Sequence, residues 1–226
     1  MTTAQEQFWQ GEFGEDYTAR SVYDPAALDD FYKQTYGVTR SAMNEEFLGI
    51  PTPAVGHPSQ EGTLEIEAKI LEVGCNVGNQ LRLLQKQGYK NLYGIEIMPS
   101  AVEQAKQLTK EINIIQGSAF DLPFKDNYFD LVFTSGVLIH IHPDDMKKAM
   151  AEIVRASKKY IWGFEYYADT LTSINYRGHT DRLWKTNFSK LFLDQFPNLK
   201  LVREKKYPYL ANARQVDAMY LMEKKS

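Results

Sequence analysis

The chain has 226 residues, with 26 lysines and arginines against 29 aspartates and glutamates and a net charge of -3. This length suits one sizeable core, and the charge balance excludes a broad basic surface for nucleic acid, although a local basic patch stays open. The opening residues lack a cationic start and no stretch approaches the ~20 apolar residues of a membrane span, so we expect neither a signal peptide nor a membrane segment. The single cysteine excludes an internal disulfide and favours a cytoplasmic location.

The chain divides by pattern into a helical cap with a connector at 1–62 and a main domain at 63–226. Segments 24–36 and 41–50 show helical spacing, and an aspartate followed by proline opens the first of them, which is typical of a capped helix start. Residues 51–62 are rich in proline and glycine and indicate a connector.

From residue 68 onward, strand-like and helix-like segments alternate. The expected strands are 69–73, 91–97, 112–117, 128–136 and 158–167, and the expected helices are 81–88, 98–110 and 143–157. This alternation predicts a parallel sheet with helices on both faces. Two more strand-like runs, 199–209 and 216–225, are close enough to pair antiparallel at one edge. We therefore expect an α/β, Rossmann-like fold with a mostly parallel seven-stranded sheet and an antiparallel edge hairpin.

The sequence ILEVGCNVGN, at residues 70–79, covers the turn after the first expected strand, where sheets of this kind bind ligands. Gly74 and Gly78 allow a sharp turn and let a ligand approach the main chain, and the next helix offers free amide hydrogens. Glu96 ends the second expected strand, where a carboxylate can accept both hydroxyls of an adenosine ribose. A tight turn without a ligand and a solvated glutamate are the alternatives.

The order and spacing of several motifs resemble the class I S-adenosylmethionine-dependent methyltransferases across residues 68–165. The motifs are Glu72-x-Gly74-x-Asn76-x-Gly78, then Glu96, then GSAFDLPFKDNYFDLVFTSGVLIHI at 117–141. Asn76 stands where that family often has glycine. Because asparagine tolerates left-handed backbone angles better than most residues, we expect the turn to survive.

The resemblance implies S-adenosylmethionine as the cofactor, S-adenosylhomocysteine as the product, and a set of cofactor-binding residues. By position these are Glu72 and the loop of Gly74, Asn76 and Gly78 at the methionine part, Glu96 on the ribose, Ile97 against the adenine, Ser118, Ala119 and Phe120 at the adenine edge, and Ser135 and Gly136 beside the sulfonium. In related methyltransferases an amino-terminal helix closes over the cofactor, and a tyrosine and an arginine grip its carboxylate. Tyr17 and Arg20 would do so here, with Phe8, Trp9 and Phe13 covering the site or packing on the sheet.

Two outer segments resemble a smaller family, the methylases associated with pseudaminic acid biosynthesis. They are FWQGEFGEDYTARS at 8–21 and EYYADTLTSINYRGHTDRLWKTNFSKLF at 165–192. That family accompanies the synthesis of sialic-acid-like nine-carbon sugars. The resemblance implies methyl transfer to a hydroxyl or amine of a nonulosonic sugar or its nucleotide conjugate, with another small metabolite as the alternative acceptor.

Methyl transfer from a sulfonium is an in-line displacement, so positioning and water exclusion supply most of the catalysis. A hydroxyl acceptor additionally predicts a base. His140 follows the fourth expected strand and is our candidate base, with packing under the loop as the alternative. His142 precedes a proline and two acidic residues, which indicates a helix start. Because the two histidines lack a third ligand at recognisable spacing, we expect no metal.

The end of the fifth strand and an insertion near 166–190 supply the expected acceptor site. A carboxylate and rings can bind sugar hydroxyls and faces, and guanidinium groups match a carboxylate or phosphate. The candidates are Glu165 and Tyr166 at the strand end, and Tyr176, Arg177, His179 and Arg182 in an insertion that also carries Lys185. Core packing for the first two and a solvated charged loop for the rest are the alternatives.

Other functional classes fit the sequence less well. A nicotinamide-dependent oxidoreductase would share the ribose carboxylate, but its G-x-G-x-x-G loop is missing, because only Gly74 and Gly78 are present in this turn. A nucleic-acid methyltransferase lacks the Asn/Asp-Pro-Pro-Tyr signature and a favourable charge. A non-catalytic cofactor-binding subunit would keep the glycine loop and lose the acceptor contacts. We therefore expect an enzyme with a small, anionic sugar acceptor and no nucleic-acid or membrane partner.

Overall fold

The structure is a computed structural model that describes residues 2–49 and 64–225, so the predicted connector at 51–62 lies outside the described residues. Its main sheet has seven strands in the order β3-β2-β1-β4-β5-β9-β8. The strands are β1 (Lys69–Val73), β2 (Asn91–Glu96), β3 (Asn113–Gln116), β4 (Phe129–Ser135), β5 (Ser157–Tyr166), β8 (Leu199–Pro208) and β9 (Val216–Lys224).

The first five of these strands are parallel, whereas β9 pairs antiparallel with both β5 and β8. The predicted mostly parallel sheet with an antiparallel edge pair is therefore confirmed. The strand order reverses between β1 and β4, where Glu72 on β1 lies opposite Gly94 on β2 and Phe133 on β4. Ligands bind beyond the carboxyl ends of the strands at such a reversal.

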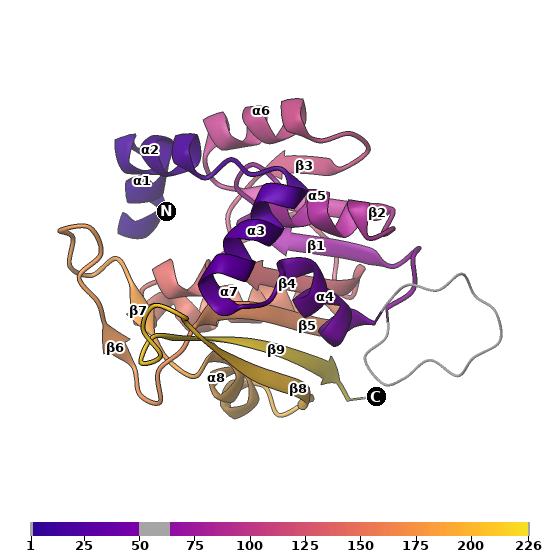
Figure 1. The fold of residues 1–226 in the computed structure, drawn as a ribbon. Helices are drawn as coiled ribbons and strands as arrows, with labels where there is room; N and C mark the ends of the chain where they lie inside the picture. Colours follow the sequence, from indigo (N-terminus) through magenta and orange to yellow (C-terminus); the bar gives the residue numbers. More distant parts are fainter. Residues whose placement is uncertain (1, 50–63, 226) are drawn as a thin grey trace.

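Helices cover both faces of the sheet. One face carries α3 (Pro25–Tyr36), α4 (Arg40–Leu48), α5 (Asn79–Lys86) and α6 (Pro99–Leu108), and the other carries α7 (Pro143–Ala156) and α8 (Phe188–Gln195). In Figure 1, α3 and α4 stand in front of the sheet. Asp24 caps α3 by accepting hydrogen bonds from two backbone amides, as the aspartate-proline pair predicts.

A further layer lies at the end of the sheet to which the parallel strands point. It consists of α1 (Ala4–Gln10), α2 (Glu12–Arg20) and a small sheet of β6 (Thr172–Ser173) and β7 (Trp184–Lys185) (Figure 1). A 3-10 turn, η1 (Leu138–His140), follows β4. The amino-terminal helices and the segment 172–185 thus lie at the same end of the sheet.

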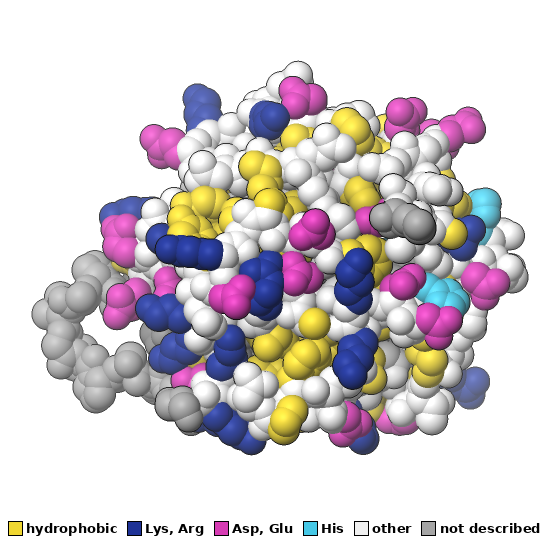
Figure 2. Space-filling view, turned by 180° about the vertical axis from the view of Figure 1, so that it is seen from behind, with side chains coloured by type: hydrophobic (Ala, Val, Ile, Leu, Met, Phe, Trp, Pro, Cys, Tyr) yellow, Lys and Arg dark blue, Asp and Glu magenta, His cyan; other side chains and the backbone are white. Residues whose placement is uncertain are grey.

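The surface seen from behind carries lysine and arginine side chains interspersed with acidic and hydrophobic ones (Figure 2). Within residues 2–49 and 64–225, no helix combines the length and the apolar character needed to cross a membrane.

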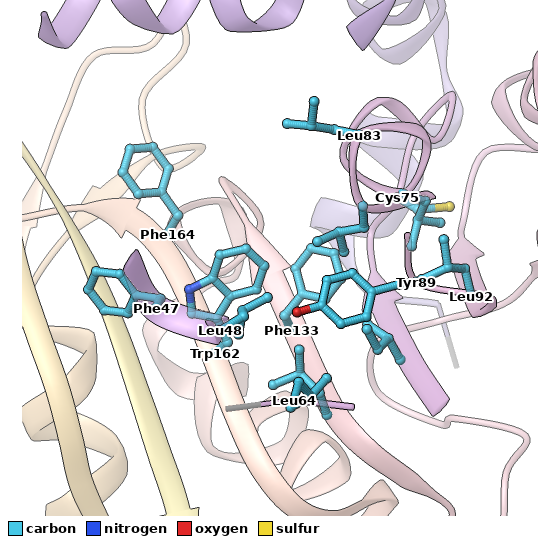
Figure 3. Packing of buried hydrophobic residues seen from close by; sticks show 14 of the residues in the cluster. Phe47, Leu48, Leu64, Cys75, Leu83, Tyr89, Leu92, Phe133, Trp162 and Phe164 are labelled. Carbon is cyan, nitrogen blue, oxygen red and sulfur yellow. The ribbon is translucent and has the colours of Figure 1, made fainter. Parts of the chain in front are cut away.

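The amino-terminal helices share their core with the sheet. Trp162 of β5 lies beside Phe47 and Leu48 of α4, and its ring centroid is 5.0 Å from that of Phe133 on β4 (Figure 3). All four side chains are at most 1% exposed. Residues on both sides of the predicted boundary near residue 62 therefore contribute to one hydrophobic core. The division into a cap and a main domain stays a prediction.

Candidate active site

A cavity of about 560 Å³ opens at the carboxyl ends of β1, β2 and β4. Its walls come from the loops after four strands, from α1, α2 and α3, and from residues at the ends of β5, β8 and β9. The cavity thus extends from the glycine loop to the antiparallel edge of the sheet.

The glycine loop after β1 has a left-handed backbone at three positions, Gly74 (φ 75°), Asn76 (φ 47°) and Gly78 (φ 78°). A Cβ on Gly74 would lie 2.6 Å from Cγ2 of Val137, so the loop packs too closely there for any side chain. Asn76 adopts the left-handed conformation that was expected of it. Gly78 is the N-cap of α5 and lies outside the cavity wall, whereas Gly74 and Asn76 line it.

The carboxylate of Glu96 joins the loops after β1 and β2. Its Oε2 accepts the Asn76 amide at 2.9 Å, and its Oε1 accepts the amides of Ile97 at 2.8 Å and Met98 at 3.0 Å. Burial raises the pKa of this carboxyl, and the three hydrogen bonds oppose that rise. Since a carboxylate accepts about four hydrogen bonds, one position remains for a hydroxyl in the cavity.

Glu72 lies in the cavity wall beneath the glycine loop. Its side chain is 2% exposed, and its Oε2 has no hydrogen-bond partner among the described residues. Burial raises the pKa of this carboxyl, with the positive charge of Arg40 acting in the opposite direction. An unpaired buried carboxylate is costly unless a cation or a donor meets it.

Helices α1 and α2 close over the cavity through hydrogen bonds to three of the strand loops. Ser118 donates to Glu6 Oε1 at 2.5 Å, Gln10 donates to the Ile97 carbonyl at 3.3 Å, and Thr18 donates to Asn76 Oδ1 at 3.2 Å. The aromatic amino-terminal segment therefore covers the site.

Tyr17 and Arg20 both line the cavity from α2, and the Arg20 guanidinium lies 5.7 Å from the centroid of the Tyr17 ring. Burial raises the pKa of Tyr17 to about 12, so its hydroxyl stays a donor at neutral pH. The remaining predicted cofactor residues Ile97, Ser118, Ala119, Phe120, Ser135 and Gly136 line the same cavity.

His140 ends η1 and is buried in the cavity wall, 9% exposed. Its Nδ1 lies 2.8 Å from the carbonyl oxygen of Arg182, which can only accept, so Nδ1 carries the proton and Nε2 keeps a lone pair. Burial lowers the pKa of His140 to about 4. The ring is therefore neutral at pH 7. By contrast, His142 caps α7 by accepting from the Asp144 amide, as a helix start predicts.

Glu165 points away from the cavity, contrary to the expectation that it binds acceptor hydroxyls. It is 1% exposed, and its carboxylate faces the amides of 137–139 at 3.2 to 3.4 Å. Burial raises its pKa to about 7. The carboxylate thus accepts hydrogen bonds from the turn that carries His140, so Glu165 holds that turn in place and does not face the acceptor.

The insertion residues divide between the cavity and the cover. Tyr166, Tyr176 and Arg177 line the cavity. His179 instead packs its ring against Phe8, with centroids 5.0 Å apart, and the Arg182 guanidinium lies 5.0 Å from the centroid of the same ring. His179 and Arg182 therefore support α1, which differs from the predicted contact with the acceptor.

A second part of the cavity was missed by the sequence reasoning. Its walls include the rings of α3 and β5 and a buried acid, with the members Tyr32, Tyr36, Phe164, Tyr209 and Asp217. The available signal was an aspartate inside the apolar run VDAMYLM, because a charged residue on a buried strand is rare unless it is paired.

Residues 71–160 match the family described as a methyltransferase domain. The chain is 31% identical to norajmaline N-methyltransferase of Rauvolfia serpentina over 94 residues, which are 39% of this chain and 32% of that protein. It is 27% identical to the chloroplastic tocopherol O-methyltransferase of Arabidopsis thaliana over 157 residues, 66% of this chain and 42% of that protein. The chain spans less than half the length of the curated relatives it matches.

Among solved structures, the fold is similar to 1,6-didemethyltoxoflavin-N1-methyltransferase of Burkholderia thailandensis, which was crystallised with 1,6-didemethyltoxoflavin and S-adenosylhomocysteine. The TM-score is 0.67 at 17% identity, and the match covers 100% of this chain and 92% of that one. The family match and the similarity in fold support a methyltransferase domain in this chain. Both also support S-adenosylmethionine as the cofactor, since its product is bound in the Burkholderia structure.

The residues present fit that cofactor. A Cβ on Gly136 would meet no atom within 4 Å, so the main chain is open to a ligand there, Glu96 has one free acceptor position for a ribose hydroxyl, and the orphaned Glu72 carboxylate suits an ammonium group. Within the described part of the chain, no three or more His, Cys, Asp or Glu side chains gather as a metal site, and the expectation of a metal-free enzyme stays a prediction.

Proposed function

We propose that this protein transfers a methyl group from S-adenosylmethionine to a small molecule held in the second part of the cavity. The observation that carries the proposal is the continuity of the cavity from the Gly74 loop to Asp217, beneath a cover of two helices. Such an arrangement excludes water and holds donor and acceptor together, which is most of what an in-line displacement needs.

In this proposal the loops after β1 and β2 hold the cofactor. Glu96 accepts a ribose hydroxyl, Glu72 faces the ammonium of the methionine part, and Tyr17 with Arg20 binds its carboxylate. Ser118, Ala119 and Phe120 contact the adenine edge, and Ser135 and Gly136 lie beside the sulfonium. The bound cofactor supplies an electrophilic methyl group.

His140 is the candidate base within this proposal. A neutral ring with its lone pair on Nε2 can accept a proton, and the Arg182 carbonyl fixes its tautomer. A base whose pKa is about 4 is weak, so its role is to orient and polarise an acceptor group as the proton leaves.

The acceptor that the sequence resemblance implies is a nonulosonic sugar or its nucleotide conjugate. The position of Arg177 favours an acceptor with an acidic group, because its exposed guanidinium lines the cavity and can pair with a carboxylate or phosphate. The names of the relatives include both N- and O-methyltransferases, so they are compatible with either an amine or a hydroxyl. The net charge of -3 suits a small acceptor better than a nucleic acid.

The proposal is tested by incubating the protein with S-adenosylmethionine and a panel of nonulosonic sugars, their nucleotide conjugates and unrelated amines and alcohols. Mass spectrometry should find one added methyl group on an acceptor, together with S-adenosylhomocysteine. Calorimetry with S-adenosylhomocysteine alone tests the cofactor half separately. Folded protein that gives neither a methylated product nor a binding signal would overturn the proposal.

A further inference from the structure

The second part of the cavity carries an acid that the proposed cofactor contacts do not use. Asp217 of β9 is 1% exposed, and its Oδ2 accepts the hydroxyl of Tyr36 at 2.5 Å and that of Tyr209 at 3.0 Å. Its Oδ1 has no hydrogen-bond partner among the described residues. One oxygen of a buried carboxylate in the cavity wall is thus unmatched.

Aromatic rings surround this acid. The centroid of the Tyr36 ring lies 5.0 Å from that of Tyr209 and 5.7 Å from that of Phe164, and Tyr32 lies 5.6 Å from Phe164. These residues line the cavity together with Tyr166. The faces of aromatic rings are electronegative and attract cations. The carboxylate and the rings therefore favour a positive charge at the same place.

The other charged group that acts on Asp217 is Lys185 of β7, whose Nζ lies 5.0 Å from the centroid of the Tyr166 ring. Lys185 is not part of the cavity wall and forms no ion pair with Asp217. Burial raises the pKa of Asp217 to about 6, while the two tyrosine hydroxyls and Lys185 oppose that rise. At pH 7.5 the group is therefore mostly a carboxylate that lacks a full counter-charge.

We propose that this end of the cavity binds a cationic amine of the acceptor, with Asp217 as its counter-ion and the surrounding tyrosine and phenylalanine rings as its cage. The inference rests on the proposed function and narrows its acceptor to molecules that carry an amine. Arg177, in the wall of the same cavity, can meet an acidic group of that acceptor. Asp217 is a specificity-determining residue in this view, and the amine that it binds need not be the atom that is methylated.

The test measures the binding of three matched probes to the protein loaded with S-adenosylhomocysteine. The bound S-adenosylhomocysteine keeps the probes out of the part of the cavity that is proposed to hold the cofactor. The probes are benzylamine, benzyl alcohol and benzoate, which are cationic, neutral and anionic at pH 7.5. Ligand-observed NMR titration should give benzylamine an affinity roughly tenfold or more above that of the others, which is about 1.4 kcal/mol. Equal affinities, or a preference for benzoate, would overturn the inference.

Two variants test whether the preference for the cationic probe depends on Asp217. Asp217→Asn should reduce benzylamine binding to the level of benzyl alcohol, whereas Asp169→Asn should leave it unchanged. Asp169 is the matched control because it also accepts a tyrosine hydroxyl, that of Tyr167, but lies outside the cavity wall. A folded Asp217→Asn protein that keeps the cation preference would refute the assignment.

A second measurement needs no variant. Benzylamine stays cationic from pH 7.5 to pH 5, while Asp217 takes up a proton across this range, so its affinity should fall severalfold and that of benzyl alcohol should not. A constant benzylamine affinity would also contradict the inference. S-adenosylhomocysteine binding is measured first. A parent protein that does not bind it would contradict the proposed function, whereas a missing preference for the cation would contradict only this inference.

Discussion

The backbone amide of Asn76 donates to Oε2 of Glu96 at 2.9 Å, so the loop after β1 is held by the side chain that ends β2. The same carboxylate accepts the next two amides of its own loop through Oε1. One acid therefore fixes the shape of both loops and keeps one position for a ligand.

Replacing Glu96 by glutamine should weaken S-adenosylhomocysteine binding by roughly 10- to 100-fold, about 1.4 to 2.8 kcal/mol. The amide nitrogen of glutamine would face a backbone N–H, and the acceptor for the ribose hydroxyl would be lost. Calorimetry measures the change. Glu67→Gln is the control, since Glu67 is an exposed partner of Lys90, and it should bind as the parent does. Equal affinity of both variants would exclude Glu96 from the cofactor site.

Much of the fold could be predicted because its signals are local. The run KILEV predicts a strand at 69–73 and the structure has β1 at Lys69–Val73, since a buried parallel strand reads as one apolar run between turn residues. The aspartate before α3 and the glycines of the first loop are equally local signals, the first of a helix start and the second of a sharp turn.

Other parts depend on long-range contacts that no local pattern encodes. Helix α8 went unpredicted and α1 was predicted only as part of a helical cap, although Thr3 and Glu6 form a capping box and Asn187 caps α8. Glu165 looked like a ligand at a strand end, but the turn after β4 takes its carboxylate. Asp217 was missed because only the folded sheet brings Tyr36 to it across 181 residues.

The contact between α2 and the site depends on a glycine. A Cβ on Gly14 would lie 1.9 Å from the Trp9 carbonyl oxygen and 2.2 Å from Cε of Met98. Gly14→Ala should therefore push α2 off the site and weaken S-adenosylhomocysteine binding by roughly tenfold, since overpacking costs about 1–3 kcal/mol. Calorimetry reports the affinity, and hydrogen exchange should report faster exchange in α1 and α2.

The matched control is Gly11→Ala in the same segment. A Cβ there would lie 3.4 Å from the nearest atom, the Gln7 carbonyl oxygen, which is an ordinary contact, and its φ of -94° suits any residue. We expect its affinity to match the parent. If the two alanine variants bound equally well, the cover would not depend on this close approach.

Glu165 should give the protein a pH-dependent stability. Its pKa is about 7 in the folded protein and 4.5 ordinarily, so the folded state holds the proton more tightly. The resulting stabilisation is fully present below pH 4.5 and is lost as the pH rises through 7. The shift corresponds to roughly 3 kcal/mol at about 1.4 kcal/mol per pKa unit.

Urea unfolding from pH 4.5 to 8 of the parent and of Glu165→Gln measures this contribution. Glutamine carries no charge, so the free energy of unfolding of the variant should fall less steeply with pH, and the two curves should converge or cross near neutrality. Curves that stay parallel over this range would show that Glu165 does not take up a proton on folding.

His140 should remain neutral across the pH range in which histidines ordinarily titrate. Burial holds its pKa near 4, and the Arg182 carbonyl fixes the proton on Nδ1. Long-range ¹⁵N–¹H correlation spectra should show constant Nδ1–H imidazole shifts from pH 5.5 to 8, with His140→Gln used to assign the signal.

Once an acceptor is known, His140→Ala should lower kcat by 10²- to 10⁴-fold if Nε2 accepts the proton, whereas His142→Ala should affect mainly stability. Unchanged turnover of His140→Ala at saturating cofactor would leave the histidine as a packing residue between Trp9 and Tyr176.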